Sequence, residues 1–318
     1  MRRAGILVVD KPGGMTSRAA AVRAGALAGA ARSGHAGTLD PLATGVLVVC
    51  LDRATLLSRF LAGGTKVYRA VALLGMETDT YDVDGEVVST SDASGVTAAE
   101  IASESARLTG ELTQEPPPFS AVKHEGKALH RYARAGVEVR PKLRAVSVRS
   151  IELEGLEPGG ELSRATLLVE CGPGTYVRSL VSDLGRALGC GACVEELRRL
   201  RSGCFTLEGA FGLGELESGE ASLEGSMLSM EEATSFMETI EVGADAAAAV
   251  RMGKPLTRQM APGWDALEAP VRVLDGKGTL LAVLGPRRPG DPEEVLGRAL
   301  RVIRPAAGNE DHEAAQAY

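Results

Sequence analysis

The sequence has few of the residues that build metal centres or disulfide frameworks. Its 318 residues include only four histidines and five cysteines, and the histidines do not recur at the spacing of metal ligands. An odd number of cysteines fits reduced thiols better than paired disulfides. Cys190-Gly-Ala-Cys193 has no second pair at zinc spacing, so we interpret it as two small residues at a junction between two helices, without a metal or redox role.

Long apolar runs and several enzyme signatures are also missing. No stretch approaches the roughly 20 apolar residues that span a bilayer. The basic start is followed by a strand-like segment with Asp10 and Lys11 rather than by the apolar region of a signal peptide. We therefore expect a soluble, cytoplasmic protein. No GxSxG is present, and Gly172-Pro-Gly-Thr175 lacks the Lys of a phosphate loop, so nucleotide binding is disfavoured.

Charge is distributed in blocks within a chain whose formal net charge is −7. Residues 1–75 carry ten Lys or Arg against three Asp or Glu, and residues 123–149 carry eight against two. Acidic residues are concentrated in 77–122 and in 205–245, and the latter has no Lys or Arg. Basic segments in an acidic chain are compatible with nucleic acid docking on one face, or with an ordinary solvated surface.

One aspartate, Asp40, lies in a loop rich in glycine, in the stretch GHAGTLDPLATG of residues 34–45. The glycines and the proline exclude a regular helix or strand there, whereas residues 46–51 form an apolar run typical of a buried strand. Asp40 thus lies in a loop that leads into the core, and Pro41 restricts its backbone to extended conformations. An ordered loop of this kind favours a chemical role, although an Asx-turn cap is the commoner use of a loop aspartate.

The remaining pattern alternates strands and helices. We predict strands at 5–9, 46–51, 66–74, 143–154 and 164–171, and helices at 17–29, 54–61, 98–108, 177–188 and 194–199. The segment 119–140 is basic, and residues 240–304 show short strands with Gly and Pro turns, typical of a small β domain. The polar tail is expected to be disordered.

Several motifs occur together in a recognisable order. They are VVDKPGGMTS, GHAGTLDPLATGVL, KVYRA, FSAVKHEGKALHRYARAGVEV, CGPGTYVRSLVSDLGRALGCGA and LRRLRSG. In sequence and interval they resemble the bacterial tRNA pseudouridine synthase B (TruB) family. The resemblance covers residues 5 to about 205 well and is weaker over 240–304, where AVRMGKPL is similar to the start of the family's C-terminal domain. Low aromatic content and Cys193, where some relatives have histidine, depart from the family.

The resemblance implies an α+β fold with a mixed, largely antiparallel sheet, flanking helices and a small C-terminal PUA-like β domain. The implied organisation is a catalytic domain at 1–206 with a thumb-like basic insertion at about 119–144, an acidic connector with short helices at 207–239, the β domain at 240–304 and a tail at 305–318.

Roles for single residues are implied in the same way. Asp40 is the catalytic aspartate, Arg178 pairs with it, and Tyr68 lies against the target uracil as the base near C5. The implied substrate-binding residues are His35, Tyr68, Tyr176, Leu197, Lys11, Lys123 and Arg131. Tyr176 and Leu197 line the uridine pocket, and His35 contacts the RNA where the flipped base leaves its stack. The implied role of Lys11 is more structural, whereas Lys123 and Arg131 lie in the basic thumb.

The implied activity is isomerisation of the uridine at position 55 of the tRNA T-loop. Nothing is oxidised or added in that reaction, so no cofactor or metal is required. Asp40 can attack C1′ or remove the C2′ proton, and the sequence does not choose between them. The expected partner is the tRNA T-arm, with no membrane, no obligatory protein partner and a monomeric enzyme.

Three other functions compete with this one. A non-catalytic RNA-binding protein or tRNA folding chaperone would keep the basic segments but would not need Asp40, Tyr68 and Arg178 together. An aspartate-dependent glycosidase would need a second carboxylate as acid, and no comparable motif supplies one. A guide-RNA-dependent synthase is disfavoured because the chain has no long basic extension.

Overall fold

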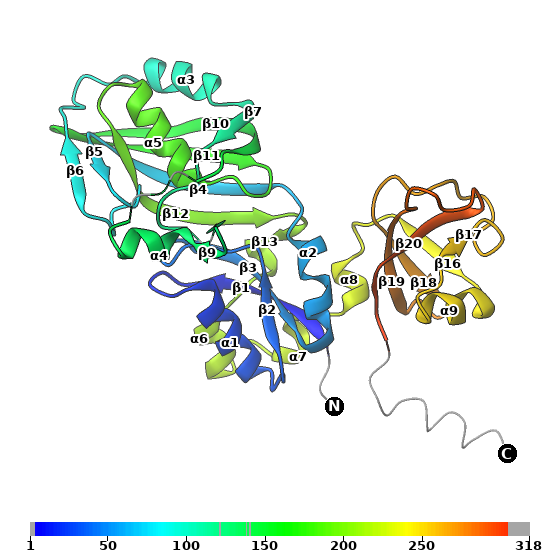
Figure 1. Cartoon of the computed structure of the whole chain (residues 1–318). Helices are drawn as coiled ribbons and strands as arrows, with labels where there is room; N and C mark the ends of the chain where they lie inside the picture. Colours follow the sequence, from blue (N-terminus) through cyan, green and yellow to red (C-terminus); the bar gives the residue numbers. More distant parts are fainter. Residues whose placement is uncertain (1–3, 121, 138, 140, 305–318) are drawn as a thin grey trace.

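The structure is a computed structural model that describes residues 4–120, 122–137, 139 and 141–304. The tail whose disorder is expected, 305–318, lies outside the described residues. Most strands belong to one large sheet and one smaller sheet, which occupy different ends of the molecule (Figure 1). Within the described part of the chain, no helix is both long enough and apolar enough to cross a membrane.

The large sheet is mixed and mainly antiparallel, as predicted. Its strands run in the order β14-β1-β3-β12-β4-β11-β10-β7, and β2, β13 and β15 pair beside this path. Only the β1–β14 and β12–β3 pairs are parallel among those described for this sheet. The bounds are β1 (Gly5–Lys11), β2 (Ser33–Ala36), β3 (Thr44–Leu51), β4 (Lys66–Leu74), β7 (Gly110–Gln114), β10 (Arg144–Gly159), β11 (Leu162–Cys171), β12 (Ala192–Ser202), β13 (Phe205–Thr206), β14 (Phe211–Gly212) and β15 (Met227–Leu228).

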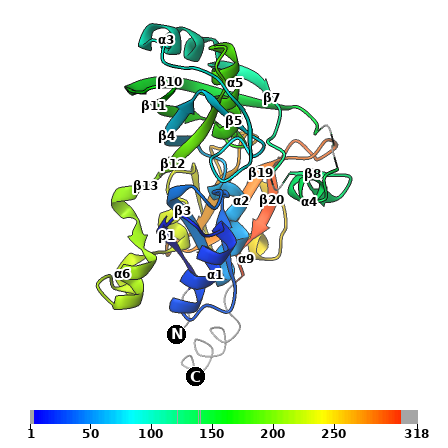
Figure 2. The ribbon, with the colours of Figure 1, turned by 90° about the vertical axis from the view of Figure 1, so that its left-hand side faces the viewer.

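Helices cover this sheet at both of its ends. Helix α1 (Ser17–Leu27) begins where the Thr16 hydroxyl accepts a hydrogen bond from the Ala19 amide, which satisfies one free N–H of the first turn. Helix α3 (Ala98–Arg107) begins with a capping box. It lies beside α5 (Val177–Ala187), and α3 packs against β10 whereas α5 packs against β12 and β4 (Figures 1 and 2). The apolar faces of α1 and α5 join one core cluster with strands β3, β4, β11 and β12.

The predicted helix at 194–199 is wrong, because these residues belong to strand β12 in the middle of the large sheet. β12 pairs with β3 on one side and with β4 on the other. The junction at Cys190 and Cys193 therefore joins a helix to a strand rather than two helices. Both thiols are buried, and burial raises the pKa of Cys193 to about 11, so it remains protonated at neutral pH.

The thumb-like segment leaves the sheet between β7 and β10. It contains the short hairpin of β8 (Lys123–His124) and β9 (Lys127–Ala128), followed by α4 (Leu129–Arg134). Figure 2 shows it at one side of the molecule, away from the sheet. A second hairpin, β5 (Met76–Thr78) with β6 (Val87–Thr90), follows β4.

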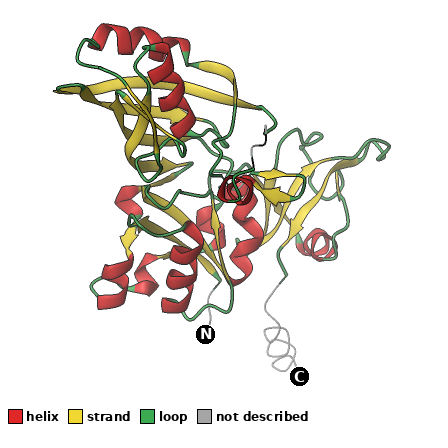
Figure 3. Ribbon diagram, turned by 60° about the vertical axis from the view of Figure 1, so that its left-hand side comes forward, coloured by secondary structure: helices red, strands yellow, loops and turns green. Residues whose placement is uncertain are grey.

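The C-terminal part forms its own five-stranded sheet, in the order β16-β18-β19-β20-β17. It encloses a separate apolar core with α9, and Figure 3 shows it beside the large sheet. Short helices and the edge strands β14 and β15 connect the two sheets. Of these elements, β14 and β15 pair with β1. The remaining bounds are α2 (Ser58–Leu61), α6 (Leu213–Ser218), α7 (Leu223–Ser226), α8 (Met230–Ala233), β16 (Thr239–Val242), α9 (Ala244–Arg251), β17 (Leu256–Thr257), β18 (Val271–Asp275), β19 (Leu280–Pro286) and β20 (Val295–Val302).

Candidate active site

The loop that carries Asp40 joins β2 to β3 and is held by buried polar groups. The Ser17 hydroxyl accepts a hydrogen bond from the Leu39 amide at 2.7 Å and donates to the Leu39 carbonyl at 2.8 Å. The Lys11 ammonium donates to the Pro41 carbonyl at 3.2 Å, and burial lowers the pKa of Lys11 to about 8 although Asp40 opposes that shift. The loop is therefore ordered, and Lys11 contributes by holding its backbone at Pro41.

Arg178 connects this loop to two other segments. It lies in the first turn of α5 with its side chain 3% exposed, and its Nε is 2.9 Å from Asp40 Oδ2. This contact is an ion pair whose N–H is not aligned as a hydrogen bond. The two terminal nitrogens donate to Asp82 Oδ2 at 2.9 Å, to the Thr80 carbonyl at 2.7 Å and to the Phe119 carbonyl at 3.0 Å. The predicted pairing of Arg178 with Asp40 is confirmed.

The second carboxylate, Asp82, is more deeply buried than the first. Its side chain is 7% exposed against 27% for Asp40. Burial raises the pKa of Asp82, and the hydrogen bond from Thr80 and the charge of Arg178 oppose this shift. Arg178 thus lies between an enclosed carboxylate that fixes it and a more open carboxylate that can meet a substrate.

Replacing Asp82 by asparagine is expected to change how stability depends on pH. Because the folded protein holds a proton on Asp82 at pH values where the unfolded chain has lost it, acidification toward pH 3.8 favours the folded wild type. Asp82→Asn lacks this contribution. Melting temperatures from pH 7 down to 4 should therefore show the difference, wild type minus variant, growing more positive as pH falls. A difference that stays constant or shrinks would contradict the assignment.

Tyr68 and Leu197 form an apolar wall beside this carboxylate loop. Tyr68 on β4 pairs with Arg199 on β12, and Leu197 pairs with Ala70, so both side chains lie on one face of the sheet. They are 8% and 6% exposed and belong to the same apolar cluster as Leu39. Burial raises the pKa of Tyr68, while the charge of Arg199 opposes that shift. The phenol is therefore neutral at pH 7.

The other predicted residues lie at different distances from this centre. His35 on β2 is partly buried, and burial together with the charge of Arg199 lowers its pKa, so the imidazole is neutral at pH 7. Tyr176 precedes α5, and its backbone amide donates to the Gln114 side chain at 2.8 Å. Lys123 and Arg131 are exposed on the thumb. No three His, Cys, Asp or Glu side chains are grouped like metal ligands among the residues described.

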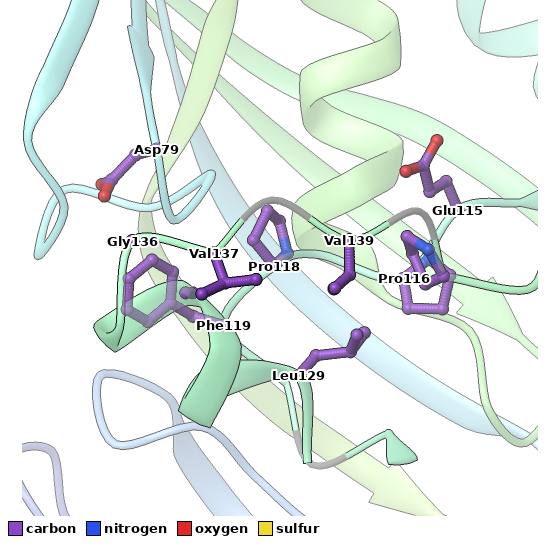
Figure 4. A pocket seen from close by; sticks show the side chains of 11 residues that line it. Asp79, Glu115, Pro116, Pro118, Phe119, Leu129, Gly136, Val137 and Val139 are labelled. Carbon is purple, nitrogen blue, oxygen red and sulfur yellow. The ribbon is translucent and has the colours of Figure 1, made fainter. Parts of the chain in front are cut away.

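A cavity of about 290 Å³ lies between the thumb and the body of the protein (Figure 4). Pro118, Phe119, Leu129 and Val137 line it, and Asp40 does not. The carbonyl of Phe119 nevertheless accepts from Arg178, so the root of the thumb touches the same guanidinium as the loop carboxylate. The cavity therefore lies next to the ion pair of Arg178 and Asp40 without including it.

Sequence reasoning missed two charged residues of this centre. Asp82 lies among several acids of an acidic, turn-rich segment, and its spacing does not distinguish it from them. Arg199 is 1% exposed, and its guanidinium donates to backbone carbonyls of the Asp40 loop. Reading residues 194–199 as a strand would have placed Arg199 on the same face as Leu197, and hence inside.

Comparisons with known proteins agree on one family. Residues 26–177 match the family described as "TruB family pseudouridylate synthase (N terminal domain)", and residues 178–235 match "tRNA pseudouridylate synthase B C-terminal domain". A tRNA pseudouridine synthase B from Thiobacillus denitrificans is 40% identical over 88% of this chain and 91% of its own. The protein of the same name from Syntrophobacter fumaroxidans is 40% identical over 94% and 97%.

Among solved structures, the chain is similar to one titled "Crystal Structure of a Cbf5-Nop10-Gar1 Complex". The TM-score is 0.71 at 26% identity, over 95% of this chain and 85% of the other. A structure of an H/ACA RNP bound to a substrate RNA gives a TM-score of 0.70 at 24% identity, which indicates a shared fold.

Proposed function

The chain belongs to the TruB family of pseudouridylate synthases, and on that premise we propose that it converts the uridine at position 55 of the tRNA T-loop to pseudouridine. The relatives named tRNA pseudouridine synthase B support tRNA as the substrate class. The observation that carries the proposal is the contact of 2.9 Å between Arg178 and a partly exposed Asp40, beside an apolar wall.

The reaction breaks the N1–C1′ bond, turns the uracil and joins C5 to C1′. The C5 proton is released and N1 takes up a proton, so the product is an isomer of the substrate. Asp40 either attacks C1′ or removes the C2′ proton, and both routes need an ionised carboxylate near the sugar. Arg178 holds one oxygen of this carboxylate in place, because its Nε forms an ion pair with Asp40 Oδ2 at 2.9 Å. More than a quarter of the side chain stays open to the ribose.

The uracil must stay in place while it is detached from the sugar. Tyr68 and Leu197 offer a flat apolar wall that would hold the free base and exclude water. Tyr68 is the proposed acceptor of the C5 proton. Because its phenol is neutral, accepting the C5 proton requires the hydroxyl proton to pass on, either to N1 of the base, which gains a proton in the product, or to solvent. Flipping the base costs a few kcal/mol, which contacts in the pocket offset.

The thumb is proposed to hold the phosphates. Lys123 and Arg131 are exposed cations that can neutralise phosphates without reading sequence. Lys123→Ala combined with Arg131→Ala should weaken tRNA binding and reduce the slope of log K against log salt by about one to two, because fewer counterions are released. Binding titrations from low to moderate salt measure this slope.

The matched control is Arg107→Ala combined with Arg164→Ala, which removes two exposed arginines from α3 and β11. We expect the control to keep the wild-type slope. Equal slopes in the thumb variant, the control and the wild type would exclude the thumb from the RNA interface.

We further propose the division into a catalytic domain at 1–206, a connector at 207–239 and a β domain at 240–304, with cytoplasmic action as a monomer. The separate apolar core of the smaller sheet supports the last boundary. The similar structure is titled as a complex with Nop10 and Gar1.

The deciding experiment uses tRNA transcript with tritium at uracil C5. Purified protein, without nucleotide or added metal, should release one tritium per tRNA into water. A transcript with cytidine at position 55 should release none. Tight tRNA binding without tritium release would instead favour a non-catalytic RNA-binding protein or a tRNA folding chaperone. Tritium release from both transcripts would support the isomerisation but contradict position 55 as the modified uridine.

A further inference from the structure

Arg199 is the largest side chain among the fully buried residues described, and its surroundings link the two sides of the active site. Its Nε donates to the Val46 carbonyl at 2.7 Å, and its terminal nitrogens donate to the Thr38 carbonyl at 3.3 Å and the Gly37 carbonyl at 3.1 Å. Gly37 and Thr38 directly precede the Leu39–Asp40 pair. The guanidinium therefore holds the incoming limb of the loop, and Lys11 and Ser17 hold the rest.

The backbone of Arg199 is fixed as firmly as its side chain. In strand β12 it pairs with Gly45 of β3 and with Tyr68 of β4. Gly45 has φ +100°, and a Cβ at this position would lie 2.2 Å from the Arg199 carbonyl oxygen, so only glycine permits this approach. One residue thus joins the Asp40 loop, the strand that follows it and the strand that carries Tyr68.

We propose that Arg199 is a positioning residue that sets the separation between Asp40 and Tyr68 in the isomerisation. The inference rests on the proposed function and adds to it a residue that does not touch the uridine. A guanidinium suits this task because its planar fork donates at once to three carbonyls, two from the incoming limb of the loop and one from β3.

The charge of Arg199 is a second reason to assign it a role. Among the ion pairs of the described residues, none includes Arg199. Its guanidinium donates to three backbone carbonyls and also has the Tyr68 hydroxyl as a hydrogen-bond partner. Burying a cation without a carboxylate is costly, so an apolar side chain would anchor the strands more cheaply. The charge lowers the pKa of His35 and opposes the effect of burial on Tyr68, so it acts on groups at both sides of the centre.

The first variant is Arg199→Lys, which keeps the charge but replaces the fork with a compact ammonium. Single-turnover tritium release with saturating tRNA should slow by about 10²-fold, since a loop shift near 1 Å costs a factor of this size. The dissociation constant of the tRNA should stay within about twofold. A wild-type rate in Arg199→Lys would overturn the proposal, whereas an inactive wild type would instead defeat the proposed function.

The control for lost stability is Lys66→Gln. Lys66 is also a buried cation that donates to backbone carbonyls, in this case those of Ala62 and Gly64 outside the Asp40 loop. Its variant should lower the melting temperature but leave the single-turnover rate near that of the wild type. If both variants lost rate in proportion to their lost stability, Arg199 would be structural only and the proposal would be wrong.

A second variant perturbs the same contact from the loop. Gly37 has φ +93°, so Gly37→Ala strains the carbonyl that Arg199 holds, while a Cβ would meet Arg199 only at an ordinary 3.6 Å. It should also slow release at unchanged tRNA affinity. In the double variant the two losses should be less than additive, because they remove one shared contact. Full additivity would contradict the proposal. If Arg199→Lys fails to fold, a wild-type rate in Gly37→Ala would contradict it as well.

Discussion

Asp40→Asn is expected to abolish tritium release, with a loss of at least about 10⁴-fold in single-turnover rate. Asparagine has the shape of aspartate and should keep the loop contacts made by Ser17 and Lys11. It lacks the negative charge that both routes require, because an amide neither attacks C1′ nor removes the C2′ proton. Since the fold and the thumb are unchanged, tRNA should bind within about threefold of the wild type.

The matched control for this variant is Asp52→Asn. Asp52 lies just after β3 and accepts hydrogen bonds from the amides of Ala31 and Arg32 through Oδ1, at 2.8 and 3.0 Å. Asparagine can keep both bonds and tolerates the φ of +50° at this position. We expect nearly full activity there. A comparable rate in Asp40→Asn would show that another group supplies the carboxylate function.

The ordered loop and the helix that carries Arg178 were predictable because each depends on local sequence. Asp40 precedes a proline and a buried strand, and Arg178 follows a turn into a helix with a clear apolar face. The pairing of Arg178 with Asp40 was implied by the resemblance to the TruB family, because neither stretch shows it alone. The catalytic and binding roles of Tyr68, Tyr176 and Leu197 remain predictions.

Strand β12 shows where local reasoning fails. Glu, Leu and Arg are good helix formers, and Leu197 and Leu200 are spaced by three, as on one face of a helix. In the sheet, Leu197 and Arg199 point inward instead, and Leu200 is only partly buried. Pairing with β3 and β4 decides the outcome, because two neighbouring strands satisfy the backbone of β12.

The same failure hides the buried Arg199 on β12. Arginine is usually exposed and leucine buried, so a pattern with Leu197 and Arg199 on the same buried face of a strand is not predicted. The burial of Arg199 is therefore missed as well. Asp82 escapes notice for a different reason, since its partner Arg178 lies 96 residues away in the chain. Long-range pairs of this kind follow from topology, which a single sequence does not specify.

Arg178→Lys is the variant that tests this long-range pair. The guanidinium contacts Asp40, Asp82 and the root of the thumb at Phe119 at the same time. A lysine keeps the charge but has one compact donor group, so it cannot hold both carboxylates in their present positions. We expect single-turnover release to fall by about 10²- to 10³-fold, with a lower melting temperature because Asp82 loses part of its buried pairing.

The control for Arg178→Lys is Arg186→Lys, two turns later on the same helix. Arg186 is half exposed and pairs with Glu77 and Asp183 at 3.4 and 3.6 Å, so its replacement should change neither rate nor stability appreciably. If Arg178→Lys matched this control, charge alone would suffice at Asp40. A large loss would instead mean that the geometry of the fork keeps the carboxylate aimed at the ribose, since lysine supplies the same charge from the same helix turn.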